Sequence, residues 1–137
     1  MATYPLSEAY ADGQVLTAAN VNSITEGVND LALLLLNAQT GTTYTLALTD
    51  VAKTITLTNA SAITLSVPTN ASVAFPIGTQ ILLYQGGAGQ VTVAAVTPAT
   101  TTIRAQGSKT KIAGQYGVAC LLKLATDTWV LFGNTAA

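Results

Sequence analysis

The stretch TITLTNASAITLSV, residues 54–67, decides the fold of this 137-residue chain. In each half of the stretch, isoleucine, leucine or valine alternates with threonine or serine. That two-residue period is typical of a β-strand with one buried face. The two halves are separated by Asn59-Ala60-Ser61, residue types that favour a turn. The stretch therefore predicts two short strands joined by a tight connection.

Similar strand patterns recur from residue 42 to the C-terminus. Glycine, proline and asparagine separate them, most clearly at Gly86-Gly87-Ala88-Gly89, which we interpret as a tight turn rather than a phosphate-binding loop because no helix follows it. Short strands about 8 to 12 residues apart are typical of an antiparallel β-sandwich or barrel-like domain, which we expect over residues 42–137. The further predicted strands are residues 44–49, 80–85, 90–96, 101–104, 109–113, 118–124 and 128–132.

Two of the predicted strands are continuously apolar instead of alternating. They contain Ile81-Leu82-Leu83 and Cys120-Leu121-Leu122. A strand of this kind is covered on both of its faces. In a domain this small, the second cover could come from a neighbouring subunit.

The N-terminal part of the chain follows a helical period. Apolar residues recur at spacings of three and four, the a/d seam of a heptad repeat, and Thr17 can cap the first turn. We expect a short N-terminal α-helix over residues 17–40, preceded by an extended arm over residues 1–16. The helix can meet copies of itself as a coiled coil or pack on the β domain of its own chain; we favour self-association. The seam residues are Val21, Ile24, Val28, Leu31 and Leu35.

The chain carries few charges for its size. Only 8% of residues are Asp, Glu, Lys or Arg, against about 25% in an average soluble domain. Two explanations are possible: other subunits cover much of the surface, or threonine hydroxyls hydrate it. We expect that both apply. A net charge of −1 provides no basic field for nucleic acid or an anionic membrane. The longest apolar run, residues 31–36, is far short of the roughly 20 residues that span a bilayer.

The residues that usually carry catalysis are scarce. There is no histidine, and the single cysteine, Cys120, lies in an apolar run. The only acids in the predicted β domain are Asp50 and Asp127, both at turn positions. We therefore expect no enzyme activity, metal or cofactor. Trp129 is expected in the core, although an exposed aromatic cluster could bind sugars.

Several segments resemble a β module of tail-fibre-like and head-decoration proteins of tailed bacteriophages. The resemblance also includes the N-terminal segment, which is similar to the opening of many phage tail and fibre proteins. Members of that group are typically homotrimers, so the resemblance implies a trimeric coiled coil, in agreement with the heptad seam. The segments are residues 12–22, 44–68, 70–79, 87–93, 113–116 and 127–134.

The resemblance and the low charge together favour a virion structural protein, made in the cytoplasm of the host bacterium because no secretory signal is evident. The short length favours a homotrimeric capsid decoration protein, or a small head fibre, that binds the major capsid protein or another virion protein. The alternative is a tail fibre or receptor-binding module that recognises a host surface glycan. The arm would dock on the particle through Tyr4, Pro5, Leu6, Tyr10, Val15 and Leu16.

Overall fold

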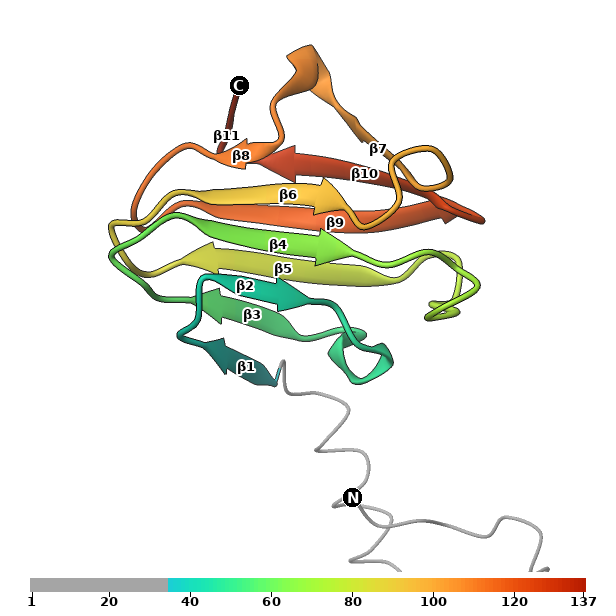
Figure 1. The fold of residues 1–137 in the computed structure, drawn as a ribbon, viewed down its shortest axis with the longest axis horizontal. Coiled ribbons are helices and arrows are strands. Elements are labelled where there is room, and N and C mark those ends of the chain that lie inside the picture. The colour runs from blue at the N-terminus through green and yellow to red at the C-terminus, as the bar shows by residue number, and fades with distance from the viewer. Residues whose placement is uncertain (1–34) are drawn as a thin grey trace, which may run out of the picture. The chain divides into compact units, whose positions relative to one another are not determined.

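The computed structural model describes residues 35–137, which form a mainly β unit of two stacked sheets (Figure 1). Sheet A has the strand order β1-β3-β5-β9-β10-β7, and sheet B has the order β11-β8-β6-β4-β2. Two short 3₁₀ helices, η1 (Leu48–Asp50) and η2 (Gln106–Ser108), lie in connections. The strands are β1 (Leu36–Gln39), β2 (Thr43–Thr45), β3 (Thr54–Leu57), β4 (Ile63–Val67), β5 (Gln80–Gln85), β6 (Val91–Ala95), β7 (Thr102–Ala105), β8 (Lys111–Ile112), β9 (Val118–Ala125), β10 (Thr128–Gly133) and β11 (Thr135–Ala136).

The first six strands wind back and forth between the two sheets. Odd-numbered strands enter sheet A and even-numbered strands enter sheet B, so that β1, β3 and β5 are parallel neighbours, as are β2, β4 and β6. Parallel neighbours need a crossover connection, and here each crossover contains a strand of the opposite sheet. The expectation of an antiparallel sandwich is therefore wrong: both sheets are mixed.

The tight connections between consecutive strands, here called corners, stack on one another at one end of the unit and hold the successive strand pairs together. Asn59, at the corner between β3 and β4, donates from Nδ2 to Thr40 O (2.8 Å), and its own carbonyl accepts from Gly89 N (2.8 Å). A Cβ atom on Gly87 would overlap the backbone of Asn59, and one on Gly89 would overlap that of Ser61. The glycines predicted to form a tight turn do so, and they are needed because two corners lie in backbone contact.

The C-terminal strands close the unit with mostly antiparallel pairs. Strand β9 lies between β5 and β10 and is antiparallel to both, whereas β7 is parallel to β10. In sheet B, β8 pairs with β6 and β11 pairs with β8. The turn between β9 and β10 contains Asp127 with φ of 52°, a left-handed conformation that aspartate tolerates.

One hydrophobic core fills the space between the sheets. Its largest member is Trp129, 1% exposed, which meets Phe75 edge to face with ring centroids 5.4 Å apart. This geometry is favourable for aromatic pairs, and it confirms the expectation that Trp129 belongs to the core. The remaining core residues are Leu46, Ile55, Leu57, Ile63, Leu65, Val67, Ile81, Leu83, Val91, Val93, Ile112, Ala119, Leu121 and Leu131.

The end of the expected helix is a strand instead. Residues 36–39 form β1, which pairs with β3 from Leu36 opposite Thr54 to Gln39 opposite Leu57. Pairing with β3 gives the backbone N–H and C=O groups of this segment the hydrogen bonds that a helix would otherwise provide. The rest of the predicted helix, residues 17–34, and the arm, residues 1–16, lie outside the described residues. Within residues 35–137, no helix has the length and apolar character that crossing a bilayer requires.

Candidate functional site

The β unit contains two buried charged side chains, each held by several hydrogen bonds. The first is Asp50, which is 0% exposed at the end of η1. Its Oδ1 accepts from Asn37 Nδ2 (2.7 Å), and its Oδ2 accepts from Tyr44 OH (2.7 Å) and from the backbone N–H of Ala47 (2.8 Å). This Asp50 cluster joins β1, β2 and η1, so it holds the first turn of chain in place.

The Asp50 cluster changes the acidity of its tyrosine. Burial raises the pKa of the Tyr44 hydroxyl above its usual 10.0, and the hydrogen bond and negative charge of Asp50 raise the pKa further. The hydrogen bond from Asn37 acts in the opposite direction and is weaker. Tyr44 is therefore a proton donor that stays protonated in the folded unit, the state its bond to Asp50 requires.

The second buried charge is Lys123 on β9, 2% exposed. Its ammonium donates to Asn70 Oδ1 (2.6 Å) and to Phe75 O (2.7 Å), and lies 5.8 Å from the centroid of the Trp129 ring, within the range of a cation–π contact. Asn70 in turn donates its backbone N–H to Asp127 Oδ1 (2.7 Å). This Lys123 cluster ties the connection between β4 and β5 to the β9–β10 hairpin.

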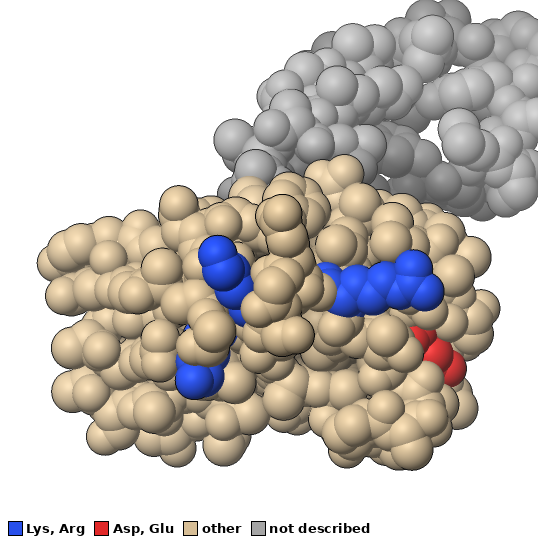
Figure 2. Space-filling model, turned by 90° about the horizontal axis from the view of Figure 1, so that it is seen from above, with Lys and Arg blue, Asp and Glu red and all other residues tan. Residues whose placement is uncertain are grey.

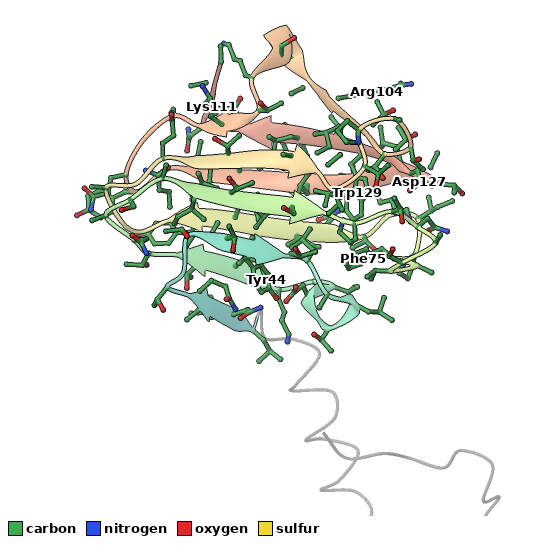
Figure 3. All side chains as sticks on the ribbon, viewed as in Figure 1. Tyr44, Phe75, Arg104, Lys111, Asp127 and Trp129 are labelled. Carbon is green, nitrogen blue, oxygen red and sulfur yellow. The ribbon has the colours of Figure 1, made fainter. Side chains whose placement is uncertain are left out.

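Figure 3 shows the labelled members of the second cluster, Phe75, Trp129 and Asp127, gathered at one end of the unit, with Tyr44 apart from them. The Asp50 carboxylate and the Lys123 ammonium are both held by protein partners. Each cluster therefore joins segments distant in sequence, and we call each one a polar lock.

The described residues offer no metal centre. Within residues 35–137, no group of three or more His, Cys, Asp or Glu side chains gathers as ligands would. Cys120 is buried, and burial raises the pKa of its thiol, although a backbone hydrogen bond from Ile81 acts in the opposite direction. A protonated, buried thiol is a poor nucleophile.

The surface of the β unit is poor in charge and rich in exposed apolar side chains. Figure 2 shows isolated basic groups and one acidic group on an otherwise uncharged face. Arg104 and Lys111 lie apart from one another (Figure 3). The large apolar residues that are exposed are Leu35, Leu36, Leu48, Ile77, Val96, Tyr116, Val118, Leu124 and Phe132.

Of the residues predicted to form an interface, only Leu35 lies in the described part, directly before β1 and 53% exposed. Val21, Ile24, Val28 and Leu31, and all of the predicted docking residues, lie outside it. Sequence reasoning missed both polar locks. The one signal for Lys123 was its position two residues after Leu121, on the face of β9 that points inward.

These features define a class of protein: a mainly β unit of two mixed sheets, stabilised by internal polar locks, with no group of three or more potential metal ligands in its described part. No protein-family model, no curated protein and no solved structure matches the chain.

Proposed function

We propose that this chain is a homotrimeric structural protein of a bacteriophage particle, a capsid decoration protein or small head fibre anchored by its N-terminal arm. The observation that carries the proposal is the scarcity of surface charge on the β unit. Its charged residues are the chain's five Lys and Arg plus Asp50 and Asp127. Since Asp50 and Lys123 are buried, only five of these seven side chains remain for the surface.

A surface of that kind suits a protein that works inside an assembly. Free monomers usually depend on many more charges to stay soluble and apart from one another. The resemblance of residues 44–68 and of the N-terminal segment to phage head-decoration and fibre proteins supports the same conclusion. A decoration protein that binds the assembled shell and not its free subunits stabilises the shell by mass action.

Variants of the N-terminal arm test whether it anchors the protein to the particle. Deletion of residues 2–16 should leave the oligomer and its β spectrum unchanged while abolishing sedimentation of the protein with purified particles. A double substitution, Tyr4→Ala with Tyr10→Ala, should weaken binding, whereas the matched control Ser7→Ala should not.

Antibody labelling of particles then separates head from tail. Label distributed over the head supports decoration. Label confined to the tail tip, together with inhibition of adsorption by the free protein, would replace the proposal with a receptor-binding module. A truncated protein that still coats particles would refute docking by the arm.

A further inference from the structure

The outer face of sheet A is mostly apolar. In its strands, alternate residues such as Ile55, Leu83 and Leu121 point into the core and are fully buried. Because side chains alternate across a strand, the intervening residues point away from the core. The strand register aligns most of these outward residues in three rows: Leu36–Thr54–Leu82–Cys120–Phe132, Ala38–Thr56–Tyr84–Val118 and Gln80–Leu122–Val130–Arg104.

The composition of these rows is unusual for a solvent-facing sheet. Nine of the thirteen residues are aliphatic, aromatic or cysteine, and the single charged one, Arg104, stands at the β7 margin. Phe132 and Leu36, at opposite ends of the first row, are 51% and 69% exposed. We call this set the sheet A face.

The outer face of sheet B has the opposite character. Its rows are Thr43–Thr64–Thr92–Lys111–Ala136 and Thr45–Ser66–Ala94. Hydroxyl groups dominate these two rows, and neither row contains a large apolar side chain. When the two outer faces of a sandwich differ in this way, burying the apolar face is favourable, whereas the polar face is well hydrated in water.

We propose that the sheet A face is where copies of this chain pack against one another around the axis of the oligomer. This inference rests on the self-association included in the proposed function. It names the surface that the copies share and assigns the sheet B face to solvent.

The face is large enough to form part of an interface with other copies. With strands about 4.8 Å apart and outward rows about 6.7 Å apart, each position covers about 32 Å², so the thirteen positions cover about 420 Å². That is as large as the largest apolar patch of a typical monomer and about half of the roughly 800 Å² per partner of a standard stable interface. In a trimer each copy contacts two neighbours, so the area that each copy buries is the sum over both contacts.

The charge of the face also suits self-packing. In a trimer, residues beside the three-fold axis face their own copies, so charges buried there would repel one another and lose their hydration. Apart from Arg104, which can stay hydrated at the β7 margin, the only ionisable side chains in the three rows are those of Tyr84 and Cys120. Sheets that pack face to face through apolar side chains lie about 10 Å apart, which residues of the size of Leu82 and Phe132 can fill.

The first test compares two glutamate substitutions in the full chain. Phe132→Glu places a charge on the sheet A face, and Thr64→Glu places one on the sheet B face. We expect Phe132→Glu to reduce the mass measured by light scattering to that of the monomer, with an unchanged far-ultraviolet circular dichroism spectrum. Thr64→Glu should keep the mass of the wild type.

The second test does not depend on disrupting the oligomer. In a Cys120→Ala background, Thr56→Cys lies on the sheet A face, in the row of Ala38, Tyr84 and Val118, and Thr64→Cys lies on the outer face of sheet B. Maleimide should label Cys at position 64 at least tenfold faster than at position 56, and the two rates should become equal in urea. Adding Phe132→Glu to the Thr56→Cys protein should restore fast labelling, because protection that comes from the assembly ends with it.

The outcomes separate the two proposals. If the wild type is an oligomer but position 56 is labelled as fast as position 64, and Phe132→Glu keeps the oligomer, the sheet A face is not the interface while self-association stands. If the wild type itself is a monomer, both the interface and the proposed assembly are refuted.

Discussion

Replacing Asp50 by asparagine tests whether the first polar lock stabilises the β unit. The substitution keeps the shape of the side chain but changes one acceptor oxygen into an NH₂ donor. In the native unit both oxygens accept, Oδ1 from Asn37 and Oδ2 from Tyr44 and the N–H of Ala47. No orientation of an asparagine amide can therefore satisfy all three donors.

The hydrogen bonds of Asp50 determine how much unfolding free energy the substitution should remove. If the new NH₂ faces Tyr44 and Ala47, the backbone N–H of Ala47 loses its acceptor; if it faces Asn37, two amide donors meet. The bond from Ala47 is only part-buried, so leaving that donor without an acceptor costs about 1 kcal/mol, and the remaining bonds lose the extra strength of an ionised acceptor. We expect a total loss of about 1.5–3 kcal/mol, which corresponds to a fall in Tm on the order of 10 °C for a unit of this size.

Urea unfolding of the full chain, followed by tryptophan fluorescence at one fixed protein concentration, measures this loss. Trp129 is the single tryptophan and is buried, so its emission reports on the core. The control Thr45→Asn, at an exposed position of β2, should change stability by no more than about 0.5 kcal/mol. If Asp50→Asn is as stable as the control, the hydrogen bonds of the Asp50 cluster do not contribute as argued.

Three further substitutions test other parts of the fold. Gly89→Ala should destabilise the unit by more than about 2 kcal/mol because its Cβ would overlap Ser61, whereas Gly114→Ala, with open space around its Cβ, should be neutral; equal effects in thermal melts would refute the stacked corners. Lys123→Met keeps an unbranched stem but removes the donor to the buried Phe75 O and to the part-buried Asn70 Oδ1, so we expect a loss of about 2 kcal/mol in urea unfolding; an unchanged midpoint would contradict the second lock. Since the folded pKa of Tyr44 is raised, its contribution is complete below pH 10 and declines as the pH rises through the folded value. Wild-type stability should therefore decrease more steeply above pH 10 than that of Tyr44→Phe, and parallel pH profiles would exclude the effect.

The alternation of the sequence predicted where most strands lie but not how they pair. Residues 63–67 and 80–85 were predicted with the bounds that the structure shows, the first from its alternation and the second from a continuous apolar run that ends before Gly86-Gly87. The parallel pairing of β3 with β5 was not predicted, since that pattern is the same for either direction of the neighbouring strand. The stacked corners that fix the direction depend on Gly87 and Gly89 meeting residues almost thirty positions away.

The strand β1 and the two polar locks could not be read from local sequence. Four consecutive leucines, residues 33–36, favour a helix by intrinsic propensity, and pairing with β3 overrides that preference for Leu36. Asn37 points toward Asp50, thirteen residues on, and Lys123 finds Asn70 at a separation of 53. Contacts at such separations are set by the tertiary fold, so a lone buried lysine or aspartate in the sequence gives no sign of its partners.

Sedimentation equilibrium of the full-length protein at micromolar concentration tests the central claim most directly. Three chains of 13.9 kDa should give a single species of about 42 kDa whose mass does not change on dilution. A homogeneous species of one chain, with the folded spectrum of a β protein, would show that the uncharged surface is not covered by other copies and would contradict the account.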